Sequence, residues 1–135
     1  MKSLFPLTTS PDLSADRDFY TGLLGFEVVF ESDWYVQLRH PDNPAAQVAF
    51  ITPGHESVPE GYREASRGVV VTVEVDDVDA LLERAEAMGL PIVQPLRDEA
   101  WGQRHFMTHD PAGLLVDVVK LTPPAGEYAA GYVQA

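Results

Sequence analysis

Apolar and polar residues alternate along much of the chain, as they do in strands with one buried face. The clearest case runs from Trp101 to Val119, where two alternating runs flank the tetrapeptide Asp-Pro-Ala-Gly at 110–113. Pro and Gly favour a tight chain reversal at such positions, so this stretch predicts a hairpin. Its second strand is almost wholly apolar apart from Asp117. A carboxylate there needs a partner, an exposed surface or a cavity, which makes it the first indication of a functional site.

Two other segments carry apolar residues at helical spacing. The first begins after Asp12 and ends at Gly25, and the second begins after Asp77 and ends at Gly89. An aspartate before the first helical turn accepts hydrogen bonds from free N–H groups, and a glycine suits the left-handed conformation that ends many helices. The pattern therefore predicts two capped helices with an offset of about 65 residues, which indicates an internal repeat.

The remaining alternating segments predict strands. One of them contains Pro6, which removes a backbone donor and therefore requires a sheet edge or a bulge. Each half of the chain then has the order βαβββ. The strands expected outside the hairpin cover residues 3–9, 26–31, 34–39 and 47–52 in the first half and 68–75 and 90–93 in the second, with 97–100 as a loop.

This order predicts an α+β fold in which two βαβββ modules form a curved mixed sheet around a cleft. A single module cannot bury both faces of its sheet, so a ligand site is expected between the two. We expect one domain over residues 1–121, followed by a tail that is either mobile or packed on a partner chain. Its parts are module 1 at about 1–52, a linker at 53–67, module 2 at about 68–121 and the tail at 122–135.

Composition narrows the possible functions. The chain has 135 residues, no cysteine, and a formal charge of −12 from 21 acidic and 9 basic residues. This charge argues against nucleic-acid binding, which needs a basic surface, and favours a cationic ligand through long-range attraction. The lack of cysteine excludes disulfides and favours a cytoplasmic location, and the sequence has no apolar run long enough to cross a membrane.

Two segments, DRDFYTGLLGFEVV and HDPAGLLVDVV, resemble the vicinal oxygen chelate superfamily. This superfamily includes glyoxalases, extradiol dioxygenases, fosfomycin-resistance transferases and bleomycin-resistance proteins. The resemblance covers roughly residues 4 to 121 and implies the paired βαβββ fold. It does not identify a reaction, because one fold hosts many functions.

The resemblance also provides a test for a metal site. Metal-dependent members take His or Glu ligands from their first, fourth, fifth and eighth strands. The matching positions here are Phe5, Phe50, Val70 (or Val69 if the register slips) and Asp117. Apolar side chains do not bind divalent cations, and selective sites need three or four protein ligands. We therefore expect no metal and no cofactor, with the family's cavity lined by apolar groups and one carboxylate.

The histidines offer a different chemistry. His105 and His109 share a strand face, but four residues of strand separate them by about 13 Å, which is too far for one ion. Asp117 can lie near His105 across the hairpin. Such a pair could bind a ligand or move a proton, or it could be a half-buried ion pair without a catalytic role. His40 and His55 are expected at the surface.

Aromatic residues favour binding of a flat ligand that is neutral or cationic. Trp34 and Trp101 lie near strand starts, and core packing is the alternative role for each. Trp101 opens a WG-x-R stretch that resembles the mouth of the cleft in other family members. Its Arg104 is expected to pair with an acid at a subunit boundary or to meet an anionic ligand group.

The sequence thus leads to a metal-free small-molecule-binding protein, expected as a homodimer. The nearest functional type is a bleomycin-resistance protein, which sequesters an antibiotic without altering it. Alternatives are a metal-independent lyase or isomerase with His105 and Asp117 as catalytic residues, a metal-dependent glyoxalase or dioxygenase, and a structural protein without a ligand. The expected ligand-binding residues are Phe5, Leu7, Trp34, Phe50, Val70, Trp101, Arg104, His105, Met107 and Asp117.

Overall fold

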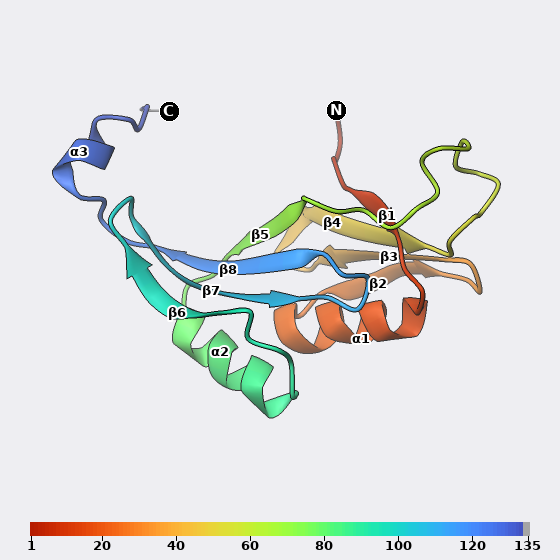
Figure 1. The fold of residues 1–135 in the computed structure, drawn as a ribbon, viewed down its shortest axis with the longest axis horizontal. Coiled ribbons are helices and arrows are strands. Elements are labelled where there is room, and N and C mark those ends of the chain that lie inside the picture. Colours follow the sequence, from red (N-terminus) through yellow and green to blue (C-terminus); the bar gives the residue numbers. More distant parts are fainter. Residues whose placement is uncertain (134–135) are drawn as a thin grey trace. The chain divides into compact units, whose positions relative to one another are not determined.

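The structure is a computed structural model that describes residues 1–133 of the chain. It contains two four-stranded mixed sheets with strand orders β1-β4-β3-β2 and β5-β8-β7-β6 (Figure 1). In each sheet the first and last strands of a module are parallel neighbours, and the other neighbours are antiparallel. The repeated order confirms the α+β fold built from two βαβββ modules.

The chain divides into two compact units. The first comprises residues Met1–Val69 together with Asp110–Leu114, and the second comprises Val70–His109 and the residues from Leu115 onward. The cleft expected between the modules stays a prediction. The elements of the first unit are β1 (Leu7–Thr9), α1 (Leu13–Leu24), β2 (Glu27–Glu31), β3 (Tyr35–His40) and β4 (Asn43–Ile51).

Helix α1 begins and ends where the sequence predicts. The side chain of Asp12 accepts from the backbone N–H of Ala15 at 3.0 Å, and Gly25 closes the helix with φ of 73°. The strand predicted over residues 3–9 is shorter in the structure, because β1 begins at Leu7 and leaves Pro6 just before it. It lies at a sheet edge, as a proline in this segment requires.

The core of the first unit lies between α1 and one face of its sheet. Val36, Leu38 and Phe50 are fully buried on that face, and the ring centroids of Phe50 and Tyr20 are 5.4 Å apart. The opposite face is more polar. There the hydroxyl of Tyr35 donates to the Gln37 side chain at 2.7 Å.

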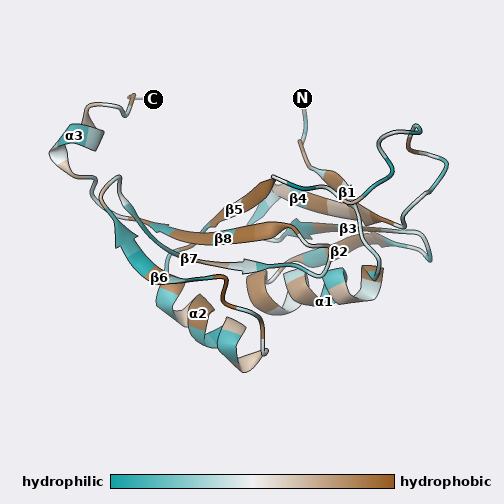
Figure 2. Cartoon of the chain, in the orientation of Figure 1, coloured by the Kyte–Doolittle hydropathy of each residue, from teal (hydrophilic) through white to brown (hydrophobic). Residues whose placement is uncertain are grey.

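The second unit repeats the plan with a more polar edge. Figure 2 shows apolar residues along β5 and β8 and polar residues along β6. Asp77 caps α2 as Asp12 caps α1, accepting from a backbone N–H at 3.0 Å. The elements are β5 (Val70–Glu74), α2 (Val78–Ala87), β6 (Gln94–Glu99), β7 (Gln103–His109), β8 (Leu115–Leu121) and α3 (Gly126–Ala129).

The prediction for the strand before the hairpin is wrong. The apolar residues 90–93 are not in a strand, and the expected loop at 97–100 largely belongs to β6. β6 is an edge strand whose sequence, QPLRDE, lacks alternating apolar residues. Its place in the sheet comes from pairing with β7, which begins with Gln94 opposite Met107.

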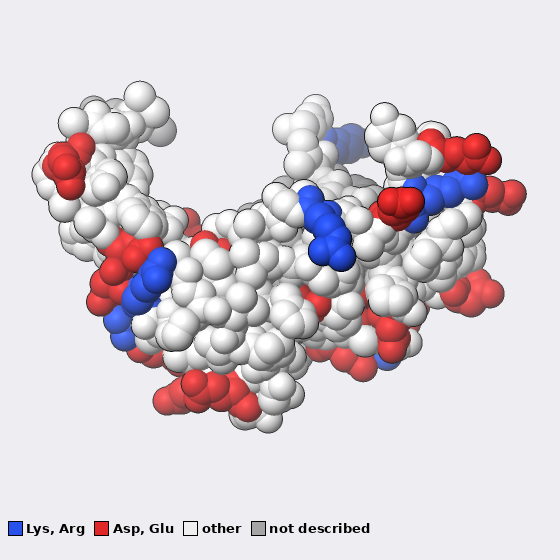
Figure 3. Space-filling view, viewed as in Figure 1, with Lys and Arg blue, Asp and Glu red and all other residues white. Residues whose placement is uncertain are grey.

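Helix α2 covers one face of the second sheet. Val78 and Ala85 are fully buried, and Asp79 on the same helix binds Arg104 of β7. Figure 3 shows acidic side chains gathered over the outer side of α2. No helix within residues 1–133 is long and apolar enough to span a membrane.

Candidate functional site

His105 lies in the middle of β7, on the face of the second sheet turned away from α2. We call this face, with His105, Met107, Asp117 and Val70, the His105 face. Nδ1 of His105 is 2.8 Å from Oδ1 of Asp117 on β8, and His105 is only 3% exposed. Asp117 opposes Met107 in the strand register, so its contact with His105 is diagonal. The structure thus brings together the two residues that the sequence pairs across the hairpin.

The other ring nitrogen of His105 faces β6. Nε2 is 3.2 Å from the side-chain nitrogen of Gln94 and 3.5 Å from Oε2 of Glu99. With the Gln94 amide as donor, Nε2 accepts a hydrogen bond and the proton of the neutral ring lies on Nδ1, facing Asp117. Glu99 also pairs with Arg97 at 3.0 Å. The imidazole is therefore held on both sides by polar groups.

This geometry does not form a chelating site. Asp117 and Glu99 contact opposite nitrogens of the His105 ring, so one ion cannot bind both carboxylates and the ring together. Over residues 1–133, no group of three or more His, Asp or Glu side chains is placed to hold a metal ion. On β5, the residue that pairs with Asp117 is Thr72, two positions after Val70.

Trp101 provides an aromatic surface beside the histidine. Its ring centroid is 6.5 Å from that of His105 with the rings nearly perpendicular, and its Nε1 donates to Oε1 of Gln103 at 2.9 Å. Trp101 is 40% exposed and Val70 is 45% exposed. An exposed indole, apolar side chains and an imidazole between carboxylates can together bind a flat molecule that carries a positive charge.

Two predicted ligand-binding residues lie elsewhere in their units. Arg104 alternates with His105 along β7 and points to the α2 side, where it pairs with Asp79 at 2.8 Å and Asp98 at 3.1 Å. These two acids of the same chain form an exposed ion-pair network with Arg104, and its predicted role at a ligand or a subunit boundary stays a prediction. Phe50 faces Tyr20 of α1 and is fully buried, so it belongs to the core.

The other predicted residues of the first unit are spread over its sheet. Phe5 is half-buried just before β1, and Leu7 is 44% exposed on β1. Trp34 stacks on His55 of the 53–67 segment, with the ring centroids 4.1 Å apart and the planes 5° from parallel. His55 was expected only as a surface residue. The ligand-binding roles of Phe5, Leu7 and Trp34 stay predictions.

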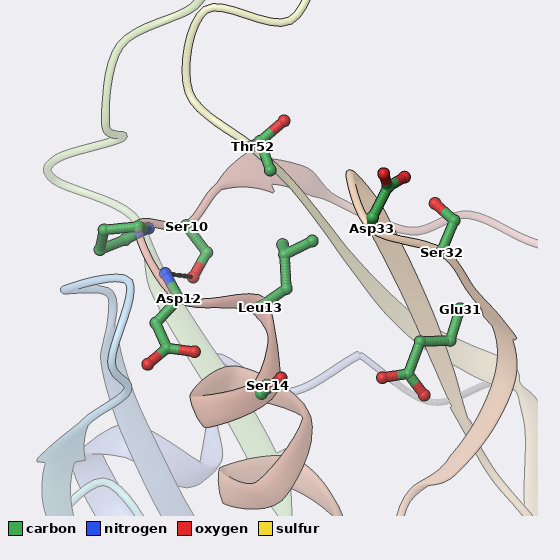
Figure 4. Close-up of a pocket in the computed structure, with 9 residues that line it drawn as sticks. Ser10, Asp12, Leu13, Ser14, Glu31, Ser32, Asp33 and Thr52 are labelled. Atoms are coloured by element: carbon green, nitrogen blue, oxygen red, sulfur yellow. Dashed lines mark hydrogen bonds between the residues drawn. The ribbon is translucent and has the colours of Figure 1, made fainter.

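The first unit also has a pocket of about 290 Å³ at the start of α1 (Figure 4). Hydroxyl and carboxyl groups surround it, and within it the backbone N–H of Asp12 donates to Oγ of Ser10 at 3.1 Å. The pocket does not include Phe5, Leu7, Trp34 or Phe50. Its lining consists of Ser10, Pro11, Asp12, Leu13, Ser14, Glu31, Ser32, Asp33 and Thr52.

The first unit also contains two buried carboxylates, one of which bonds to Ser10 of this pocket. Asp16 of α1 accepts from the hydroxyl of Ser10, and Asp110 accepts from the hydroxyl of Tyr20 at 2.8 Å. Burial raises the pKa of Asp16 to about 7, and the nearby charge of Asp110 adds to this effect. Burial also raises the pKa of Asp110. The signal in the sequence is the position of Asp16, an acid within the apolar stripe of its helix.

Sequence reasoning missed Gln94, Arg97 and Glu99 at the His105 site. All three lie on β6, the strand whose limits were predicted wrongly. Since β6 has few apolar residues, only its pairing with β7 identifies which of its side chains reach His105.

Comparisons with known proteins agree with this architecture. The protein-family model described as Glyoxalase/Bleomycin resistance protein/Dioxygenase superfamily matches residues 7–118. "Anthracycline biosynthesis protein DnrV" of Streptomyces peucetius is 33% identical over an alignment of 113 residues that covers 77% of this chain and 41% of DnrV. DauV of Streptomyces sp. (strain C5), with the same description, is 31% identical over an equal span. The chain therefore spans about two fifths of the length of these relatives.

Solved structures share the fold at lower identity. TioX from Micromonospora sp. ML1 has a TM-score of 0.71 and 23% identity, over 90% of this chain and 99% of TioX. A lactoylglutathione lyase from Agrobacterium tumefaciens has a TM-score of 0.68 and 21% identity, over 87% of this chain and 91% of the lyase. Two repeated βαβββ modules with this strand order define a small α+β protein of the glyoxalase type. The chain belongs to the Glyoxalase/Bleomycin resistance protein/Dioxygenase superfamily.

Proposed function

We propose that this protein binds a planar aromatic small molecule with a basic amine, without a metal, at the His105 face. The observation that carries the proposal is the position of His105, held between Asp117 and the side chains of β6 beside the half-exposed ring of Trp101. The indole offers a stacking surface, and the carboxylates around the imidazole attract a cation.

The donor set supports binding without a metal. Beside Asp117, strand β5 offers Thr72 and Val70, neither of which is a usual ligand of a transition metal. The nearest imidazole already donates or accepts at both of its nitrogens within the protein. A ligand that is held by shape, stacking and charge requires no metal ion.

The relatives support an aromatic ligand. Both curated relatives are described as anthracycline biosynthesis proteins, and anthracyclines are planar aromatic compounds. The formal charge of −12 favours approach of a cationic molecule. We expect the protein to act as a cytoplasmic homodimer and to sequester its ligand unchanged, as a bleomycin-resistance protein does.

A metal-independent lyase or isomerase is the second candidate. The Asp117–His105 contact supports it, because a carboxylate on Nδ1 orients an imidazole whose Nε2 can accept a proton. Nε2 already contacts Gln94 and lies near Glu99, so a substrate must displace these groups before the ring can act. Binding without turnover needs no such rearrangement, which is why it is preferred.

Calorimetric titration tests the proposal. The probes are doxorubicin, which is a planar aromatic amine, a neutral anthraquinone of similar size, and a non-aromatic amine. Doxorubicin is expected to bind more tightly than either of the others, and Trp101→Leu is expected to weaken its binding about tenfold. Tyr62→Leu is the matched control, because Tyr62 is an exposed aromatic residue of the first unit. Equal affinity of the wild type for all three probes, or no binding of any, would overturn the proposal.

A further inference from the structure

The segment after β8 packs on the turn that carries Trp101. The backbone N–H of Thr122 donates to the carbonyl of Gly102 at 2.9 Å, and that of Ala125 donates to the carbonyl of Ala100 at 2.8 Å. The hydroxyl of Tyr132 donates to the carbonyl of Trp101 at 3.0 Å. Two main-chain hydrogen bonds and one from the Tyr132 side chain therefore hold residues 122–132 against residues 100–102.

Gly102 makes this close packing possible. It is buried and has φ of +106°, and a Cβ atom at this position would lie 2.7 Å from the carbonyl oxygen of Thr122. It would also lie 3.3 Å from Pro124. A side chain at residue 102 is thus excluded both by the backbone conformation and by the segment that covers it. This accounts for the glycine that follows the tryptophan.

Trp101 contacts aromatic rings on two sides. The ring of Tyr128, on α3, is 6.4 Å from the indole at an interplanar angle of 73°, while His105 is 6.5 Å away at 81°. Trp101 and Tyr128 are each about two fifths exposed, so burial alone does not fix either ring. The indole contacts the Tyr128 ring and donates a hydrogen bond to the Gln103 side chain.

We propose that Tyr128 is a positioning residue that sets the orientation of Trp101 at the His105 face and thereby contributes to selection of planar aromatic ligands. The segment 122–133 then holds Tyr128 against Trp101 and so supports the His105 face. The inference rests on the proposed function for its ligand, but the contact between the two rings can be tested separately. An edge-to-face aromatic pair corresponds to a factor of about 2 to 10 in an equilibrium constant, which is the size of effect expected.

The experiment uses a Trp34→Phe background, in which Trp101 is the single tryptophan of the chain. In this background Tyr128→Ala is expected to shift the Trp101 emission to longer wavelength and to increase its quenching by acrylamide. The Kd for doxorubicin, measured by calorimetry, is expected to rise about 2- to 10-fold. Tyr128→Phe keeps the ring and is expected to leave the Trp101 emission and the Kd at the values of the Trp34→Phe parent. Gly102→Ala is expected to resemble Tyr128→Ala, because the added Cβ displaces the segment that carries Tyr128.

Tyr62→Ala is the control and is expected to change neither readout. If the wild-type protein does not bind doxorubicin, the proposed function fails, and the emission of Trp101 in the Trp34→Phe background still tests the positioning role. Unchanged emission and unchanged Kd in Tyr128→Ala would overturn the inference. If Tyr128→Phe changes the Trp101 emission and the Kd for doxorubicin as much as Tyr128→Ala does, the inference is also overturned, because the ring would then not be the determining group. Circular dichroism of each variant identifies any that fails to fold. If Tyr128→Ala fails to fold, Gly102→Ala, which displaces the Tyr128 ring without removing it, takes its place in the comparison with Tyr128→Phe.

Discussion

The hydroxyl of Tyr20 donates a 2.8 Å hydrogen bond to Oδ2 of Asp110, 90 residues later in the chain. Tyr20 belongs to the FYTGLLGF segment, and Asp110 opens the Asp-Pro-Ala-Gly turn. The backbone N–H of Leu114, just after this turn, donates to Oδ1 of Asp110 at 2.9 Å. The Tyr20–Asp110 bond, inside the first unit, therefore joins the helix of one segment that carries the family resemblance to the turn of the other. The tyrosine stabilises the aspartate that organises the turn.

Tyr20→Phe is expected to lower the free energy of unfolding. The change leaves one oxygen of a buried carboxylate without its phenol donor, which costs about 1–3 kcal/mol. Urea unfolding measures this difference, with the exposed Tyr62→Phe as control. Equal effects of the two substitutions would contradict the role of the Tyr20–Asp110 bond.

Stability is expected to depend on pH through Asp16. Burial raises its pKa from 3.8 to about 7 in the folded protein, so between these values the folded state holds a proton that the unfolded state has lost. The free energy of unfolding should therefore fall as the pH rises from about 4 to 7, by about 3 kcal/mol. Denaturant unfolding across this pH range measures the slope.

Asp16→Asn removes the titrating group and keeps a polar side chain beside Ser10. This variant is expected to lose that component of the slope and to gain stability relative to the wild type above pH 7. Asp18→Asn, on the exposed side of the same helix, is the control. An unchanged slope in Asp16→Asn would show that the buried carboxylate does not titrate in this range.

The N-caps of α1 and α2 are expected to contribute similarly to the free energy of unfolding. Asp12 and Asp77 each accept from a backbone N–H at 3.0 Å. Replacement of either by alanine is expected to cost about 1 kcal/mol of stability. Thermal unfolding of the two single variants checks this, and the exposed Asp42→Ala serves as control. A loss confined to one helix would contradict the equivalence of the two caps.

Arg104 and His105 are neighbours in sequence with different expected roles. Arg104→Ala breaks exposed ion pairs with Asp79 and Asp98, so a small, salt-dependent loss of stability is expected with no change in Kd for doxorubicin. Asp117→Asn is expected to weaken doxorubicin binding, because it removes a charge beside His105. Calorimetry on both variants compares the two faces of β7. Weaker binding in Arg104→Ala with normal binding in Asp117→Asn would reverse the assignment.

Much of the fold could be predicted because its signals are local. The caps at Asp12 and Asp77, the glycine at residue 25 and the turn at 110–113 lie where the sequence places them. The repeat followed from the spacing of these marks. Strand β6 was missed because a polar edge strand is specified by its neighbour, and period-two alternation does not reveal it.

The site was predictable only in part for the same reason. His105 and Asp117 could be paired because both lie on one hairpin, whose register follows from its turn. Gln94 and Glu99 reach His105 from β6, so their contacts with it could be predicted only once the limits of β6 were known. Phe50 was expected in the cavity but packs on Tyr20 of α1, since an error of one residue in a strand moves a side chain to the opposite side.

Doxorubicin titration of chelator-treated protein tests the central claim most directly. The titration is performed after removal of metals and again after addition of Ni²⁺, Zn²⁺ or Mn²⁺. Binding at the His105 face through stacking and charge predicts the same Kd in every case, together with a weaker Kd in Trp101→Leu. Binding that appears only after a metal is added, and that Trp101→Leu leaves unchanged, would contradict the account.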